Sequence, residues 1–168
     1  MKKRNEPHDA PSREFALWKT ITLGVRRDAR ALLKDLEENG FTACDDAVDI
    51  MAKPAFAVAR RKTKIGLVIV SVGDLGFTEA TPLRDIYRQA RKIGLKLCPA
   101  EAGPQFRLQY GDQPCNEWLR VAMKAITGAD GRPHVFRVAH DGDGRWLDAP
   151  WANPNCTWSP RSSFLFRR

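Results

Sequence analysis

The sequence predicts an α+β fold in which a mostly antiparallel, twisted sheet carries two to three helices packed on one side. Three observations predict it. Helical spacing of apolar residues is confined to the first half of the chain. The second half consists of short alternating segments separated by Gly, Pro and Asp turn residues. The length of 168 residues and the hydrophobic fraction of 43% suit one domain with its own core.

The first thirteen residues differ from the remainder. They are polar and contain Pro7 and Pro11, so we expect residues 1–13 to form a flexible tail. Residues 14–168 contain no repeat and no linker, and we expect them to form a single α+β domain.

Three segments are expected to be helices, because apolar residues recur in them at helical spacing. Gly40 and Gly94 follow two of these segments and are typical helix stops. The last helix is expected to have Thr81 as its N-cap and Pro82 in its first turn. The expected helices cover residues 26–39, 44–53 and 82–93.

The other elements are expected to be strands. Residues 65–72 are apolar on both faces, which indicates a central strand, and we expect this strand to form a hairpin with residues 56–59. A second hairpin is expected to turn at Asp141–Gly144. The further expected strands cover residues 15–23, 95–98, 106–110, 118–126, 134–140, 145–147 and 164–166.

Basic side chains are the first candidate for function. The formal net charge is +8, which favours an acidic partner such as nucleic acid or another acidic macromolecule. Arginine is abundant and suits bidentate contact with phosphate. Alternatively, charged turns and helix faces only keep the protein soluble, since no helix-turn-helix or RNP-like motif is present. The expected acidic-partner site consists of Arg60, Arg61, Lys62, Lys64, Arg84, Arg88 and Arg91.

A polar group in the second half is the other candidate. On the expected strand, Arg107 and Gln109 share the face opposite to the aromatic residues and point outward. Together with Gln113 and Glu117 they could bind a small polar ligand, and Glu101 could act as the general base of a small enzyme. Alternatively, these residues form a surface Glu–Arg pair that contributes about 0–1 kcal/mol.

We expect no metal site and no cofactor. His134 and His140 lie six residues apart on one expected strand, which separates them by about 20 Å. The loop that begins at Asp141 has Ala152 where a calcium loop has glutamate. The cysteines lack the spacing of zinc ligands, and we expect them to be reduced and mostly buried.

The expected location is the cytoplasm, without a membrane partner. No apolar segment follows the basic N-terminus, and the apolar run at residues 65–72 is too short to cross a bilayer. Trp151 and Trp158 lie in a loop rich in Pro and Asn. They either cover the sheet, stack on bases or sugars, or form a homodimer interface.

Short motifs spread along the chain form a set. They are residues 97–110 (LCPAEAGPQFRLQY), Asp112-Gln113-Pro114, Glu117-Trp118-Leu119, Trp18-Lys19-Thr20-Ile21, Lys53-Pro54-Ala55-Phe56 and Asp143-Gly144-Arg145-Trp146-Leu147. Together they resemble a group of short hypothetical proteins from bacterial genomes over about residues 15–168. No activity is assigned to that group, so the resemblance implies no catalytic residues. The chain departs from the group at Arg26-Arg27 and Arg60-Arg61, where it is more basic.

Overall fold

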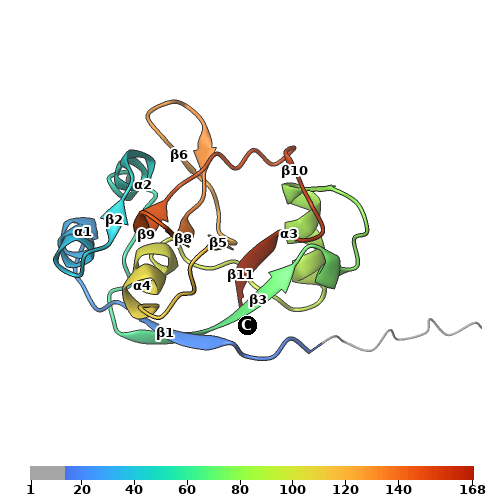
Figure 1. Ribbon diagram of the computed structural model, residues 1–168, viewed down its shortest axis with the longest axis horizontal. Coiled ribbons are helices and arrows are strands. Elements are labelled where there is room, and N and C mark those ends of the chain that lie inside the picture. Colours follow the sequence, from blue (N-terminus) through green and yellow to red (C-terminus); the bar gives the residue numbers. More distant parts are fainter. Residues whose placement is uncertain (1–13) are drawn as a thin grey trace, which may run out of the picture.

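A computed structural model describes residues 14–168 (Figure 1). The tail expected at residues 1–13 lies outside the described residues. No helix in the described part of the chain is long and apolar enough to cross a membrane. The helices within residues 14–168 are α1 (Ala29–Glu38), α2 (Asp45–Met51), α3 (Leu83–Lys92) and α4 (Ala102–Gln109), with a 3₁₀ turn η1 (Gly73–Leu75).

Most strands belong to one seven-stranded sheet of order β1-β3-β11-β5-β8-β9-β2. Its strands are β1 (Lys19–Leu23), β2 (Thr42–Ala43), β3 (Thr63–Ser71), β5 (Glu117–Val121), β8 (Arg137–Asp141), β9 (Gly144–Asp148) and β11 (Ser163–Arg167). Two small sheets pair β4 (Thr81–Pro82) with β10 (Thr157–Trp158), and β6 (Ile126–Thr127) with β7 (Pro133–His134).

The α+β class is confirmed, but two details of the expectation are wrong. The large sheet is mixed, because β11 runs parallel to β5 and β2 runs parallel to β9. Four helices are present within residues 14–168 rather than two to three, and they do not share one side. Figure 1 shows α3 on one side of β3 and β11, and α1, α2 and α4 on the other.

The sheet curls around α4. This helix contacts β1 at one edge of the sheet and also β8 and β9 toward the other edge. Its first six residues, from Ala102 to Arg107, are all buried, which is unusual for a helix of a small domain. The core therefore includes the interior of this curl, and α4 brings its own polar side chains into it.

The pairing of β3 differs from the expected hairpin. Residues 56–59 are not a strand, and β3 instead pairs with β1 and with β11, both antiparallel. The position of β3 inside the sheet is confirmed and agrees with its apolar residues on both faces. The hairpin of β8 and β9 around Asp141–Gly144 is also confirmed, and the Asp143 amide donates to Asp141 Oδ1 there.

The largest error concerns residues 106–110, which are not a strand: residues 106–109 belong to α4, and Tyr110 follows it as the C-cap. Residues 95–98 form only isolated bridges, and Thr81 belongs to β4 and donates its hydroxyl to the Glu79 carbonyl instead of capping α3. The expected burial of the cysteines is correct for Cys98 only, since Cys115 is exposed and the other two are half-buried.

Candidate functional site: a basic cleft between α1, β3 and α4

Basic residues from two distant segments meet at one end of the β1–β3 pair. Leu23 is paired with Thr63, so the chain that leaves β1 runs beside the chain that enters β3. Gly24 has a φ of +68°, and a Cβ at this position would lie 2.3 Å from the Arg61 carbonyl oxygen. Only glycine allows this approach. It places Arg26 and Arg27 beside the segment that holds Arg60 and Arg61.

Glu101 fastens these two segments to α4. It is only 1% exposed, and its carboxylate accepts hydrogen bonds from the Gly24 and Ala59 amides, both at 2.7 Å. Gln105 donates to the same carboxylate at 3.1 Å. A buried carboxylate needs such donors to replace its water shell. Glu101 thus positions the basic segments rather than facing solvent as expected.

Gln109 holds β1 from the side that has no neighbouring strand. Its side-chain amide accepts from the Thr22 amide and donates to the Thr22 carbonyl, both at 2.9 Å. It also donates to Gln105 Oε1 at 3.0 Å. Glu101, Gln105 and Gln109 therefore form a continuous chain of hydrogen bonds along one face of α4, and the edge strand is satisfied by a side chain.

A cleft of about 650 Å³ opens where these elements meet. Four elements supply its walls: the end of β1, helix α1, the start of β3 and helix α4. It is lined by Thr22, Val25, Asp35, Asn39, Lys62, Lys64, Gln105, Leu108 and Gln109. The cleft thus brings together Lys62 and Lys64 of the expected basic site and Gln109 of the expected polar site.

Positive charge dominates this cleft. Lys62 and Lys64 are exposed, and within residues 14–168 neither has a carboxylate at ion-pair distance. Asp35, the acidic residue of the lining, is already paired with Arg26 at 2.5 Å. The side-chain amides of Gln105 and Gln109 already donate hydrogen bonds within the protein, to Glu101, Thr22 and Gln105. The lysine ammonium groups are therefore the groups that could bind an anion there.

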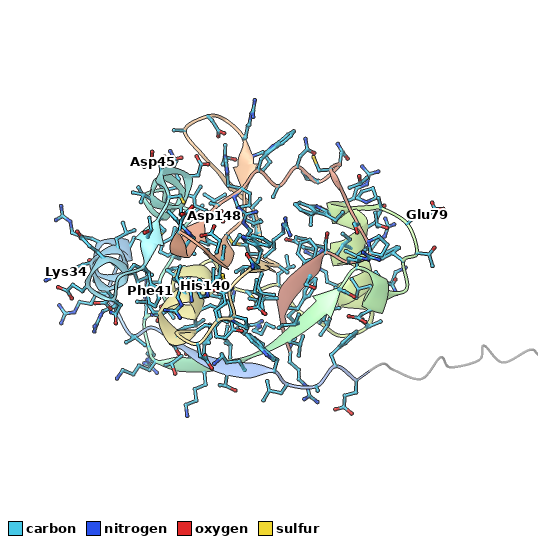
Figure 2. All side chains as sticks on the ribbon, in the orientation of Figure 1. Lys34, Phe41, Asp45, Glu79, His140 and Asp148 are labelled. Atoms are coloured by element: carbon cyan, nitrogen blue, oxygen red, sulfur yellow. The ribbon has the colours of Figure 1, made fainter. Side chains whose placement is uncertain are left out.

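The three arginines of α3 are not part of this cleft. None of Arg84, Arg88 and Arg91 lines it, and Figure 1 shows α3 on the other side of β3 and β11 from α1 and α4. Figure 2 shows Lys34 of α1 and Glu79, just before α3, at opposite ends of the molecule. Arg88 is also paired with Asp85 at 2.8 Å. The expected acidic-partner site is thus divided into two surfaces.

Arg107 and Gln113 face the protein interior. Arg107 is 0% exposed, and its guanidinium donates to Gln113 Oε1, the Ala139 carbonyl and the Tyr110 carbonyl. Its charge lies 4.7 Å from the centre of the Phe41 ring. Burial, and secondarily the positive charge of Arg145, lowers the pKa of Arg107 to about 10, so it remains charged at neutral pH.

The other polar residues of the expected ligand site also have partners in the protein. Gln113 donates to the Glu117 and Val138 carbonyls, and Glu117 accepts from the Tyr110 hydroxyl at 3.0 Å. Burial and this contact with Glu117 raise the pKa of Tyr110 to about 12. Glu101, Arg107 and Gln113 do not line the cleft. A role of these residues in ligand binding or catalysis stays a prediction.

Several residues of the cleft were missed from the sequence. Gln105 could have been found, since Glu101, Gln105 and Gln109 have the i, i+4, i+8 spacing of one helix face. Thr22, Asp35 and Asn39 carry no such signal, because only the packing of α1 and β1 against α4 brings them together.

The remaining candidates have ordinary structural surroundings. His134 donates from Nδ1 to the Ala149 carbonyl and has Asp130 beside Nε2, and His140 donates from Nδ1 to the Gln113 carbonyl. No group of three or more His, Cys, Asp or Glu side chains suited to a metal ion is found in the described part of the chain. Trp158 packs against Phe164 and Arg120, whereas Trp151 is 44% exposed, so a homodimer interface at Trp151 stays a prediction.

The chain was compared with protein-family models, curated proteins and solved structures, and none of the three comparisons gives a match.

Proposed function

We propose that this protein is a non-enzymatic binding protein that holds an acidic partner, with nucleic acid as the partner class, at the basic cleft. The observation that carries the proposal is the convergence, at one end of the β1–β3 pair, of exposed cations that have no ion-pair partner among residues 14–168. Two lysines lie inside the cleft and two arginines lie directly before them in the sequence. These residues are Arg60, Arg61, Lys62 and Lys64.

The mode of binding follows from the groups that are free. The side-chain amides of Gln105 and Gln109 are occupied by the protein, and no aromatic ring of residues 14–168 lines the cleft as a platform for a base. The expected contacts are therefore between phosphate oxygens and the basic side chains, which give affinity without reading sequence. A net charge of +8 adds long-range attraction for a polyanion.

Titration of the full chain into labelled single- and double-stranded oligonucleotides tests the proposal. Binding should weaken steeply between about 50 and 200 mM salt. The slope of log K against log salt should be about −0.9 per phosphate contact for duplex DNA and about −0.7 for single strands. Absence of binding at the lower salt concentration would contradict the proposal.

A charge-reversal variant locates the site. Arg60→Glu/Arg61→Glu/Lys62→Glu should weaken binding more than about tenfold and reduce the salt slope by about two to three, because up to three phosphate contacts are lost. The matched control is Arg84→Glu/Arg88→Glu/Arg91→Glu on α3, which changes the net charge by the same amount. Equal weakening by both variants would mean that binding follows net charge alone, and would contradict a site at the cleft.

A further inference from the structure

A second cavity, of about 500 Å³, lies beside α3 and away from the basic cleft. It is enclosed by one face of α3, by the segment that follows β5, and by the loop between β9 and β10. Most of its lining is apolar, and no carboxylate of residues 14–168 contributes to it. The lining residues are Leu83, Arg84, Tyr87, Arg91, Leu97, Met123, Lys124, Ala125, Val135, Ala152 and Pro154.

Backbone hydrogen bonds hold these walls in place. The first amides of α3, at Leu83 and Arg84, donate to the Cys156 and Pro154 carbonyls at 3.0 and 3.1 Å. The Ala152 amide donates to the Pro133 carbonyl at 2.8 Å. Because the α3 N-terminus is fastened to the loop in this way, the cavity is formed before a ligand arrives, as is usual for small-molecule sites of about 300–1,000 Å³.

Tyr87 contributes its ring to the wall of this cavity. Its ring packs edge-on against Phe164 and Phe166, and its hydroxyl oxygen is buried without a hydrogen bond of ordinary geometry. Burial raises the pKa of Tyr87, and the nearby Met123 backbone offsets this only in part, so the hydroxyl keeps its proton. Because the protein covers this oxygen, Tyr87 adds apolar ring surface to the cavity, and the charged groups that could meet a ligand lie at the rim.

Positively charged side chains lie on two sides of this cavity. Arg91 comes from α3 and Lys124 from the segment after β5; both are exposed, and neither has an ion-pair partner within residues 14–168. Arg84 adds a third positive charge, which is shared with Asp85 at 3.8 Å. An apolar interior with a cationic rim is complementary to a ligand that has an apolar body and one anionic end.

We propose that this cavity binds a small amphipathic carboxylate of the medium-chain fatty acid class. The alkyl chain lies against Leu83, Leu97 and Val135. The carboxylate pairs with Arg91 and Lys124 at the rim. This binding is independent of the basic cleft, because the two sites share no lining residue.

The probe is sodium octanoate, titrated into the full chain by calorimetry and followed by amide chemical shifts. The uncharged control ligand is 1-octanol. Octanoate should bind more tightly than octanol, with shift changes confined to the residues that line the cavity. Arg91→Glu/Lys124→Glu should weaken octanoate binding by about tenfold or more, as expected for a desolvated charge pair, and leave octanol binding unchanged.

Two further variants serve as controls, one outside the cavity and one that fills it. Arg60→Glu/Lys62→Glu in the basic cleft makes the same change of net charge and should leave octanoate binding as in the wild type. Ala125→Phe fills the half-buried wall of the cavity and should abolish binding of both ligands. The proposal is overturned if octanoate does not bind at millimolar concentration, or if it binds to the Ala125→Phe or the Arg91→Glu/Lys124→Glu variant as tightly as to the wild type.

Discussion

Buried polar side chains hold together the segments that surround α4. Glu101 joins the chain after β1 to the chain before β3, and Arg107 joins α4 to β8 through the Ala139 carbonyl. Both charges are removed from water, so their stability depends on the hydrogen bonds that the protein supplies. Each acts as a connector whose loss leaves partners on several elements unpaired.

Replacement of Glu101 by Gln should destabilise the protein by about 2–3 kcal/mol. The amide has one acceptor oxygen where the carboxylate has two, so either the Gly24 or the Ala59 amide loses its partner. Chemical denaturation measures the change. Glu117→Gln is the control and should cost less than about 1 kcal/mol, because this half-buried side chain accepts one hydrogen bond, from Tyr110. Equal effects of the two substitutions would contradict the structural role given to Glu101.

His134 is a second residue whose surroundings predict a measurable property. Its Nδ1 lies 2.6 Å from the Ala149 carbonyl oxygen and its Nε2 lies 3.0 Å from Asp130 Oδ2. Both neighbours are acceptors, so the doubly protonated ring fits best. Burial alone would lower the pKa of His134, but the Ala149 carbonyl and the Asp130 carboxylate together raise it above its usual value.

The stability of the protein should therefore decline as the pH rises through the titration of His134. A raised pKa contributes stability that is fully present below the unfolded value of about 6.5 and is lost above the folded pKa. Asp130→Asn removes the charge that favours the imidazolium and should flatten this decline. The melting temperature of both proteins, measured between about pH 6 and pH 8, checks it. Identical pH profiles would show that the Asp130–His134 pair makes no contribution.

At the scale of elements, α4 is the helix around which the others are arranged. Its sequence alternates Phe106, Leu108 and Tyr110 with polar residues, a pattern typical of a strand. Phe106 and Tyr110 are also four residues apart, which is the spacing of one helix face. With Phe106 in α4 and Tyr110 as its C-cap, their ring centres lie 5.1 Å apart. Pro104 causes no break, since it lies in the first turn, where an amide has no partner within the helix.

Gly103 of α4 should not tolerate a side chain. Alanine normally stabilises a helix by about 1 kcal/mol relative to glycine. Here a Cβ would lie 2.5 Å from the Phe136 ring, so we expect Gly103→Ala to destabilise the protein by about 1–3 kcal/mol. Thermal or chemical unfolding measures it, with Gly142→Ala as control, since a Cβ there meets nothing within 4 Å. A stabilising Gly103→Ala substitution would mean that α4 and Phe136 are not packed this closely.

At the scale of the whole molecule, the strand that comes last in the sequence lies in the middle of the sheet. β11 is paired with β3 on one side and β5 on the other, so within residues 14–168 it joins the β1–β3 pair to the part of the sheet that holds β5, β8, β9 and β2. Phe164, Leu165 and Phe166 of β11 are each at most 1% exposed. The two halves of the sheet therefore share one core only when this strand is in place.

Removal of residues 163–168 should abolish cooperative unfolding of the entire chain. Without β11, both β3 and β5 expose a row of unpaired backbone groups, and the apolar residues that face β11 lose their cover. Circular dichroism and the dispersion of amide signals compare the truncated and full chains. A truncated chain that still unfolds in one sharp transition would contradict this account of the sheet.

The expectations that succeeded rest on local patterns. The helices at residues 29–38 and 83–92 and the interior strand β3 follow from the spacing of apolar residues, which reports which face of an element is buried. The turn at Asp141–Gly144 follows from the conformational freedom of its residues, and Gly144 has a φ of +141°. These features depend on residues close together in the chain.

What the sequence by itself determined is the α+β class, the main helices, the interior position of β3 and the excess of basic charge. Tertiary structure alone decided the pairing of β3 with β1 and β11, the helical state of α4, and the burial of Glu101, Arg107 and Gln113. The physical reason is that each of these depends on partners distant in sequence. An alternating segment is stable as a strand only if another strand offers it hydrogen bonds, and α4 instead lies inside the curl of the sheet, where its polar side chains bind the backbone of Thr22, Gly24 and Ala59.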